Sequence, residues 1–247
     1  MIRVTLINPN TSRVMTEKIA RAAHDVAAPD VEIVAVCPEP GDGPPAVESH
    51  LDEVRAAAAV VSMIVRDQES GGSDAYVVAC FGDPGVDAAR ELVEVPVIGI
   101  AEAAMHVAAL TGRSFGIVTT LSRTLGRARD LVRRYGFDEA CVAAHATGIP
   151  VLALEEQADV DEIVAWCERA VRVDGADAIV LGCAGMADLC ATLTGELGVP
   201  VVDGVAASVG LVSGMARMGV GTSKRDEYAA IGTRETPATR VADSVMA

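Results

Sequence analysis

Two matching stretches decide the fold of this chain: Asp-Ala-Tyr-Val-Val-Ala-Cys at residues 74–80 and Asp-Ala-Ile-Val-Leu-Gly-Cys at residues 177–183. Their final residues, Cys80 and Cys183, are separated by 103 residues (183 − 80). Each cysteine ends a short apolar run and is followed within two residues by a glycine, which is typical of a buried strand that ends at the rim of a parallel sheet. The pattern predicts one thiol in each half of the molecule, placed to meet the other across a cleft.

Strand-like and helical segments alternate along the rest of the chain. Short apolar runs are followed by amphipathic stretches such as residues 14–26 and 160–173. This alternation indicates an α/β fold with mostly parallel strands that are buried on both faces. The predicted strands are residues 3–8, 32–36, 75–80, 95–100, 115–119, 178–183 and 200–203.

A second pair of similar segments indicates an internal duplication. Val-Pro-Val-Ile at residues 95–98 corresponds to Val-Pro-Val-Val at residues 199–202, at an offset that nearly equals the spacing of the cysteines. We therefore expect two pseudo-symmetric lobes, each a mostly parallel sheet flanked by helices, with the active site in the cleft between them. The expected lobes are residues 1–111 plus 205–247, with Cys80, and residues 112–204, with Cys183.

Two segments lack the periodicity of a helix or strand. Gly and Pro are concentrated at residues 37–45, which predicts a surface loop that is also long enough to act as a lid over a site. Residues 220–247 are rich in Thr, Arg, Asp and Glu and show no regular apolar spacing. We expect this tail to be extended or disordered.

The composition excludes several classes of protein. Hydrophobic residues make up 51% of the 247 residues, which is enough for a large core. The net charge of −15 excludes a nucleic-acid partner, because phosphate binding needs a basic surface. No run of 18 apolar residues occurs, and the chain opens on a strand-like run rather than a signal peptide. We therefore expect a cytoplasmic protein without a membrane partner.

The cysteine pattern favours free thiols over a disulfide scaffold or a metal site. Six cysteines occur without a CxxC pair or a Cys/His cluster, so we expect no bound metal. The sequence also lacks the usual phosphate-binding, dinucleotide-binding, zinc-protease and serine-hydrolase motifs, and its histidines show no catalytic spacing. It therefore predicts a site that works without a cofactor. The cysteines interpreted as core residues are Cys37, Cys141, Cys167 and Cys190.

The segments that follow Cys80 and Cys183 predict reactive thiols. Residues 81–85, Phe-Gly-Asp-Pro-Gly, lead from Cys80 to a helix predicted near Val86, so unpaired N–H groups and the helix N-terminus favour a thiolate. Since the segment after Cys183 repeats this design, we expect both pKa values to lie below the free-thiol value of about 8.5. Two alternatives are a redox pair, which needs Cα atoms within about 7 Å, and an oxyanion site made by the same amides.

Polar residues follow two further predicted strands and can reach the same crevice. Asn10 follows the first strand, and Thr119 and Thr120 follow the strand that opens the second lobe. Each of them either caps the next helix or contacts a ligand. No motif places an Arg or Lys at the site, which favours a neutral ligand, although a nest of amides can also bind a carboxylate.

Three segments together resemble the Asp/Glu/hydantoin racemase superfamily: Ile-Asn-Pro-Asn-Thr-Ser at residues 7–12, Ala-Cys-Phe-Gly-Asp-Pro-Gly at residues 79–85 and Leu-Gly-Cys-Ala-Gly-Met at residues 181–186. The similarity runs from Arg3 to about Gly219 and is strongest to the hydantoin racemase branch, which includes allantoin racemases. It implies cofactor-independent racemisation of 5-substituted hydantoins, a small-molecule substrate, and a homo-oligomer. In this branch two cysteines act from opposite faces of C5, which implies those roles for Cys80 and Cys183.

The implied chemistry assigns the remaining site residues. Two bases of the same type suit a reaction that joins mirror-image states. The developing enolate oxygen needs donors that are already in place. The candidates are the Thr119 or Thr120 hydroxyl and the N–H groups near Phe81, Gly82, Ala184 and Gly185, with Asn10 expected to hold the ring amide.

Several other functions stay open at this point. An allantoin racemase, an amino-acid racemase and a two-cysteine isomerase of the same superfamily would use the same two thiols. A decarboxylase with a single cysteine is disfavoured because both cysteines are present. A two-lobed ligand-binding protein closes a similar cleft without catalysis.

Overall fold

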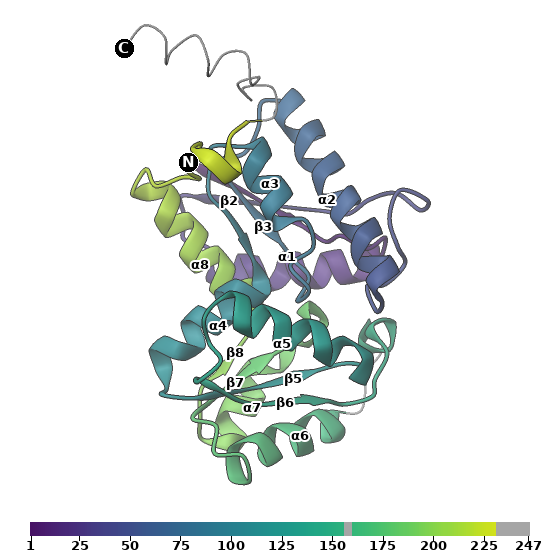
Figure 1. The fold of residues 1–247 in the computed structure, drawn as a ribbon, viewed down its shortest axis with the longest axis vertical. Coiled ribbons are helices and arrows are strands. Elements are labelled where there is room, and N and C mark those ends of the chain that lie inside the picture. Colours follow the sequence, from purple (N-terminus) through teal and green to yellow (C-terminus); the bar gives the residue numbers. More distant parts are fainter. Residues whose placement is uncertain (156–159, 231–247) are drawn as a thin grey trace, which may run out of the picture.

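Two four-stranded sheets, each entirely parallel, form the centres of two lobes that lie one above the other in Figure 1. The computed structural model describes residues 1–155 and 160–230. The first sheet has the order β2-β1-β3-β4 and the second the order β6-β5-β7-β8, so the two lobes repeat one topology. The strands are β1 (Ile2–Ile7), β2 (Val31–Val36), β3 (Ala75–Val78), β4 (Val97–Gly99), β5 (Phe115–Thr119), β6 (Cys141–Ala146), β7 (Ala178–Leu181) and β8 (Val201–Val202).

Helices connect the parallel strands and cover the sheets. The side chain of Ser12 accepts the Met15 N–H at 3.0 Å and so caps the first helix, the role expected for a hydroxyl residue at this position. In the segments that the structure describes, every helix is too short or too polar to span a membrane. The helices are α1 (Arg13–Val26), α2 (His50–Glu69), α3 (Val86–Leu92), α4 (Ile100–Thr111), α5 (Leu125–Arg134), α6 (Val160–Arg172), α7 (Cys190–Leu197) and α8 (Gly204–Arg217), with 3-10 turns η1 (Ser122–Thr124), η2 (Val151–Glu155), η3 (Ala184–Leu189) and η4 (Asp226–Tyr228).

The predicted fold class is confirmed, and one strand is added. All seven predicted strands occur, although those predicted to end at Cys80 and Cys183 stop two residues earlier. The additional strand is β6, an edge strand whose sequence, Cys-Val-Ala-Ala-His-Ala, contains a single β-branched residue. Strand propensity is therefore weak there, and pairing with β5 determines the extended conformation.

The register of the strands places the two cysteines at equivalent points. Ile7 pairs with Val78 in the first sheet, and Val118 pairs with Leu181 in the second. Cys80 lies two residues after Val78 of β3, and Cys183 lies two residues after Leu181 of β7. Because the carboxyl ends of parallel strands share one edge, each thiol lies at the edge where its sheet faces the cleft.

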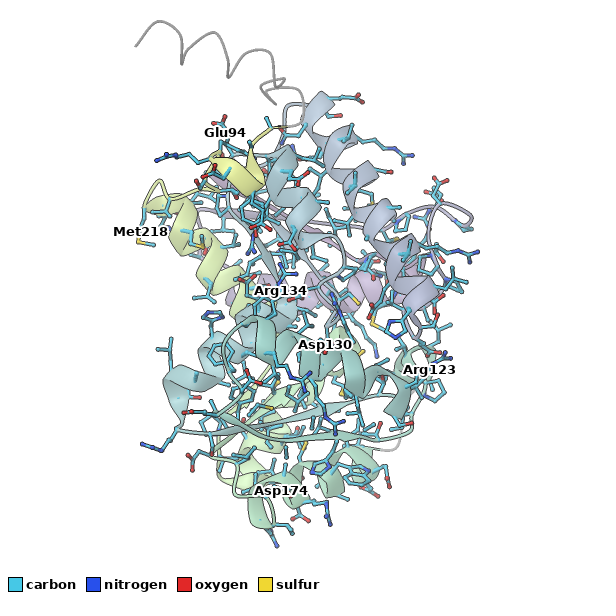
Figure 2. The ribbon with its side chains drawn as sticks, in the orientation of Figure 1. Glu94, Arg123, Asp130, Arg134, Asp174 and Met218 are labelled. Atoms are coloured by element: carbon cyan, nitrogen blue, oxygen red, sulfur yellow. The ribbon has the colours of Figure 1, made fainter. Side chains whose placement is uncertain are left out.

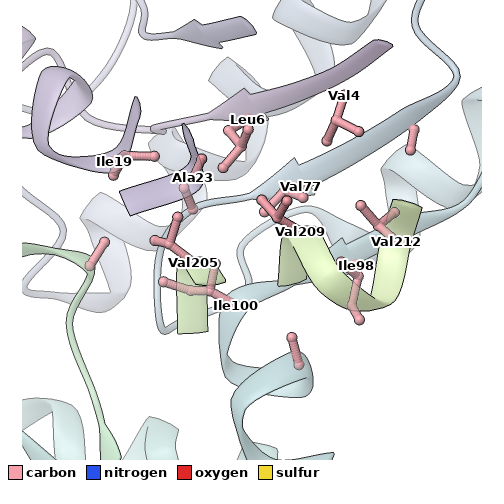
Figure 3. Packing of buried hydrophobic residues seen from close by; sticks show 14 of the residues in the cluster. Val4, Leu6, Ile19, Ala23, Val77, Ile98, Ile100, Val205, Val209 and Val212 are labelled. Atoms are coloured by element: carbon pink, nitrogen blue, oxygen red, sulfur yellow. The ribbon is translucent and has the colours of Figure 1, made fainter. Parts of the chain in front are cut away.

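The last helix of each repeat packs on the sheet of the other repeat. Helix α4 follows β4, yet its buried face, residues 101–108, joins the apolar cluster of β5 and β7. Helix α8 follows β8, and its Val205, Val209 and Val212 pack against β1 and β3 of the first sheet (Figure 3). The two helices begin side by side, since a Cβ on Gly204 would lie 2.6 Å from the Ile100 carbonyl oxygen. This exchange of helices between the two repeats holds the lobes together.

The lobe boundaries stay a proposal in light of this exchange. Packing of α8 on the first sheet supports the assignment of residues from 205 onward to the first lobe. Helix α4, which the boundary at residue 111 places in the first lobe, contributes its side chains to the second. Residues 220–230 extend along the first lobe, where the Thr222 N–H donates to the Glu94 carbonyl at 2.7 Å. The expected tail from 231 to 247 lies outside the described residues.

Gly99, at the end of β4, fits beside a buried carboxylate. A Cβ at this position would lie 2.1 to 2.5 Å from the carboxyl atoms of Asp83. That carboxylate accepts the N–H groups of Ala101 and Glu102 at 3.0 and 2.9 Å and so caps α4. Any side chain at position 99 must therefore displace the cap.

Gly99→Ala is expected to lower the free energy of unfolding by about 1–3 kcal/mol, the usual cost of overpacking. The matched control is Gly210→Ala in α8, where no atom lies within 4 Å of the new Cβ. That change is expected to stabilise the protein by about 0.5–1 kcal/mol, because alanine favours a helix over glycine. Urea unfolding followed by circular dichroism measures both, and equal stability of Gly99→Ala and the wild type would contradict the close approach.

Candidate active site

A pocket between the lobes contains both predicted thiols. Its empty volume, including the part open to solvent, is about 630 Å³. Cys80 and Cys183 line it, and neither takes part in a disulfide. Of the other predicted site residues, Gly185 does not line the pocket, because it packs against Met15 and Leu154. The predicted site residues that line the pocket are Asn10, Phe81, Gly82, Thr119, Thr120 and Ala184.

A tight turn after β3 holds Cys80. The Asp83 N–H donates to the Cys80 carbonyl at 2.9 Å, and Asp83 adopts a left-handed φ of 46°. The Gly82 N–H donates to the Cys80 sulfur. Phe81 lines the pocket and joins the apolar cluster of the second lobe. The turn therefore directs the Gly82 amide at the sulfur, and Phe81 attaches the turn to the second lobe.

An equivalent turn after β7 holds Cys183. The Gly182 N–H donates to the Val118 carbonyl at 2.8 Å, and the Thr119 hydroxyl donates to the Gly182 carbonyl at 3.0 Å. The Gly185 N–H then donates to the Cys183 sulfur, as its counterpart Gly82 does for the other thiol. Although Gly185 is outside the pocket lining, its amide acts on the site through Cys183.

Burial raises the pKa of both thiols, so the expectation of lowered values is wrong. The pKa of Cys80 rises to about 12 and that of Cys183 to about 11, in each case mainly because the thiolate loses solvent. The amides of Gly82 and Gly185 lower these values, but one amide for each sulfur does not offset the desolvation. Helix α3 begins only at Val86, too far along the chain to compensate.

The charges around the two thiols differ. Glu53 and Asp83 further raise the pKa of Cys80, since both carboxylates oppose a second negative charge. Lys18 lowers the pKa of Cys183, while Glu48 raises it. The Lys18 ammonium donates to the Leu154 carbonyl and is thereby held near Cys183. Of the two sulfurs, Cys183 therefore ionises more readily.

Asn10 is held by its neighbours with one side of its amide turned to the pocket. Its Oδ1 accepts from Asn8 Nδ2 and from the Ser12 N–H, each at 2.9 Å. Asn8 in turn donates to the Thr16 hydroxyl at 3.0 Å. Within residues 1–155 and 160–230, no acceptor bonds to Nδ2 of Asn10, a residue that is 5% exposed and lines the pocket. The Nδ2 group of Asn10 is thus oriented to donate a hydrogen bond to a ligand in the pocket.

The two threonines at the end of β5 have different roles. The Thr119 hydroxyl donates to the Gly182 carbonyl and so supports the Cys183 turn. Thr120 also lines the pocket, and its hydroxyl bonds to no residue in the described part of the chain. Thr120 is therefore the better placed of the two to donate to a ligand.

Arg127 is a pocket residue that the sequence did not reveal, and it corrects the expectation that no cation lies at the site. From α5 in the second lobe, its Nε and Nη2 donate to the Gly82 carbonyl at 3.0 and 2.7 Å. Its Nε also lies 3.6 Å from Oε1 of Glu53. Both groups come from the first lobe, 45 or more positions away in sequence, so no local motif marks the contact.

Further contacts across the lobes surround the Cys80 turn. The Tyr135 hydroxyl donates to Oδ2 of Asp83 at 2.7 Å, and Arg134 pairs with Asp87 of α3. Figure 2 labels Arg134 and Asp130 on α5, along the boundary between the lobes. Burial raises the pKa of Asp83 to about 6, even though three hydrogen bonds favour its charged form. The turn is therefore fixed from both lobes.

The remaining cysteines and histidines lie apart from the pocket. Cys167 is fully buried, as expected for a core residue, while Cys37, Cys141 and Cys190 are half-buried. His145 bonds to Asp174 at 2.6 Å on the outer side of the second lobe. In the described ranges, no three His, Cys, Asp or Glu side chains group closely enough to hold a metal ion.

Comparisons with known proteins agree with this architecture. A profile of the Asp/Glu/Hydantoin racemase family matches residues 4–212. A hydantoin racemase of Pseudomonas sp. strain NS671 is 41% identical over 92% of this chain and 91% of its own, and one of Rhizobium meliloti is 42% identical over 92% and 94%. The structure of an allantoin racemase from Klebsiella pneumoniae is 49% identical, covers 96% of each chain and superposes with a TM-score of 0.91.

The family match, the sequence identities and the shared two-lobed fold together define a racemase, an isomerase that inverts a stereocentre. The chain belongs to the Asp/Glu/Hydantoin racemase family. Within that family it is a racemase of the hydantoin racemase group.

The raised pKa values predict slow alkylation of both site thiols by iodoacetamide at neutral pH. Because only the thiolate reacts, the rates should lie roughly a hundredfold or more below that of a free cysteine at pH 7.5. They should rise about tenfold per pH unit toward pH 11, with Cys183 ahead of Cys80. Peptide mass spectrometry measures each site, with the urea-unfolded chain as the control. A plateau in the folded protein between pH 7 and 8 would instead indicate preformed thiolates.

Proposed function

We propose that this protein racemises 5-substituted hydantoins at C5 without a cofactor, with Cys80 and Cys183 as the two proton-transfer groups. The observation that carries the proposal is the pair of thiols that line one pocket from equivalent turns of two parallel sheets. Two like groups that flank one carbon suit a reaction whose forward and reverse directions are mirror images. The relatives at 41% and 42% identity are named hydantoin racemases, which supports the substrate class.

The proposed reaction moves two protons and breaks no other bond. One cysteine, as thiolate, takes the proton from C5, and the electron pair passes to the C4 carbonyl as an enolate. The other cysteine, as thiol, then gives a proton to the opposite face of C5 while the carbonyl re-forms. After one turnover the protonation states of the two cysteines are exchanged.

High thiol pKa values suit this chemistry. A hydantoin C–H is a weak acid, so a strongly basic thiolate makes the proton transfer less unfavourable than a weakly basic one. The amides of Gly82 and Gly185 stabilise each thiolate by a hydrogen bond, and Lys18 adds a positive charge near Cys183. We therefore expect Cys183 to be the first thiolate in the free enzyme.

Polar groups of the pocket would hold the ring and its enolate. We assign the Thr120 hydroxyl and the Ala184 N–H as donors to the enolate oxygen and Nδ2 of Asn10 as donor to a ring carbonyl. Donors that are oriented before the charge develops lower the barrier most. Phe81 and Gly82 complete the wall beside Cys80, while Thr119 acts by supporting Gly182.

The charge balance of the pocket favours a neutral ring over an amino acid. Arg127 is satisfied by the Gly82 carbonyl and lies beside Glu53, so its charge is not available to a substrate carboxylate. This disfavours an amino-acid racemase. Allantoin is a hydantoin with a ureido group at C5, and the 49% identity to an allantoin racemase supports its inclusion among the substrates.

Cys80→Ser and Cys183→Ser are each expected to lower racemisation by at least about a thousandfold, because a serine hydroxyl is a far weaker acid than a thiol. Optical rotation of L-5-substituted hydantoins and of allantoin measures the rate. Exchange of C5 hydrogen in D₂O should persist for one enantiomer in each variant, since one thiolate can still act on its own face. Unchanged racemisation in either variant would refute the two-base reaction, and a wild type that binds hydantoins without turnover would favour a binding protein.

Thr120→Val and Thr119→Val separate the two roles assigned to these hydroxyls. Thr120→Val should lower kcat/KM by about a hundredfold, the usual effect of removing one oxyanion donor, with little change in stability. Thr119→Val should lower the free energy of unfolding by about 1–3 kcal/mol, because it leaves the buried Gly182 carbonyl without its donor. Steady-state kinetics and urea unfolding of both variants check this, and identical profiles would contradict the distinction.

A further inference from the structure

Beside the main pocket lies a second hollow, which we call the vestibule. It is lined by Glu48, Ser49, His50 and Arg123, and it shares Val47, Glu53, Thr124 and Arg127 with the main pocket. Figure 2 labels Arg123, which marks the vestibule on the side of the second lobe that faces the first. Glu53 is the only carboxylate among the described residues that line both spaces. Glu53 therefore lies between the pocket that holds the two thiols and the vestibule.

The proposed racemisation requires a proton to return after every turnover. A turnover in one direction leaves the acid cysteine as thiolate and the base cysteine as thiol, which is the form that acts on the product. Before the enzyme can repeat the same direction, one cysteine must gain a proton from solvent and the other must lose one. Both cysteines are half-buried and line the pocket between the lobes, so this exchange has to follow a route through the pocket lining or its water.

Glu53 reaches toward Cys80 across a gap that Gly82 leaves open. A Cβ on Gly82 would lie 3.4 Å from Oε1 of Glu53 and 3.9 Å from the sulfur of Cys80. Because residue 82 has no side chain, no Cβ fills the space between the carboxylate and the sulfur, and water can enter it. Arg127, with Nε 3.6 Å from the same Oε1, holds the carboxylate in this position.

The other oxygen of Glu53 faces solvent. Its Oε2 lies 3.8 Å from Nδ1 of His50, whose side chain is 90% exposed. The Glu53 side chain itself is 22% exposed. One carboxylate thus extends from the neighbourhood of the half-buried Cys80 thiol to the edge of the bulk water.

We propose that Glu53 carries protons between Cys80 and solvent and so resets Cys80 in the free enzyme between turnovers, while Cys183 exchanges its own proton with water in the pocket. In its acid form Glu53 gives its proton to the Cys80 thiolate, which leaves a carboxylate and a thiol. In its carboxylate form it takes the proton from the Cys80 thiol, which leaves an acid and a thiolate. Water in the vestibule restores either form of Glu53, and no other bond changes. This role rests on the two-thiol racemisation proposed above.

The test removes the carboxylate and then supplies one from solution. Glu53→Ala should lower kcat at saturating substrate about tenfold or more and lower kcat/KM much less, because the reset occurs in the free enzyme. Sodium formate, small enough for the space vacated by the side chain, should restore kcat in proportion to its concentration. Glu53→Gln keeps the size of the side chain and a hydrogen-bonding oxygen near Arg127, and it should show the same loss of kcat without rescue.

Glu48→Ala is the matched control. Glu48 is the other carboxylate of the vestibule that the structure describes, but it accepts the Val151 N–H at 2.8 Å and does not line the main pocket. Formate should not raise kcat in this variant or in the wild type. Rescue that is confined to Glu53→Ala supports the proposal.

Three results would overturn the inference. Equal losses of kcat and kcat/KM in both Glu53 variants, with no response to formate, would assign Glu53 a purely structural role with Arg127. An unchanged kcat in Glu53→Gln would show that the exchange follows another route. A wild type that racemises no hydantoin would overturn the proposed function and this inference with it, and the wild-type assay distinguishes that result from the other two.

Discussion

The exchange of helices between the two lobes is the constraint on which the rest of this structure depends. Helix α4 packs on one face of the second sheet, and helix α8 packs on one face of the first. Since one face of each sheet is covered in part by a helix from the other repeat, separation of the lobes would expose core residues to water at a large free-energy cost. The pocket is consequently formed by two surfaces whose relative position is fixed by the core.

The Cys80 turn shows how the same constraint reaches the chemistry. Asp83 caps α4 with its carboxylate and accepts a hydrogen bond from Tyr135, while Arg127 holds the adjacent Gly82 carbonyl. The turn is thus bound to the helix that crosses between lobes and to α5 of the opposite lobe. A thiol on such a support keeps its position relative to the other thiol, as acid/base transfer on two faces of one carbon demands.

Electrostatics in the pocket follow from burial more than from local dipoles. Loss of solvent raises the pKa of both thiols, and the amide directed at each sulfur only moderates the effect. The guanidinium of Arg127 is matched by Glu53 and a backbone carbonyl, so the pocket presents little free charge. Such a space suits a neutral ring whose charge develops only during the reaction.

The features that repeat along the chain could be predicted from local sequence patterns. Apolar runs that end in cysteine, together with the second repeated segment, predicted two parallel sheets and one thiol at the rim of each, because strand periodicity and chain direction are local properties. The groups that surround those thiols depend instead on how distant segments pack together. Arg127, Glu53 and Tyr135 meet the Cys80 turn from distant helices, and β6 is a strand through its pairing with β5. The degree of burial, and with it the direction of the pKa shifts, depends on how all these elements close together, which no local pattern encodes.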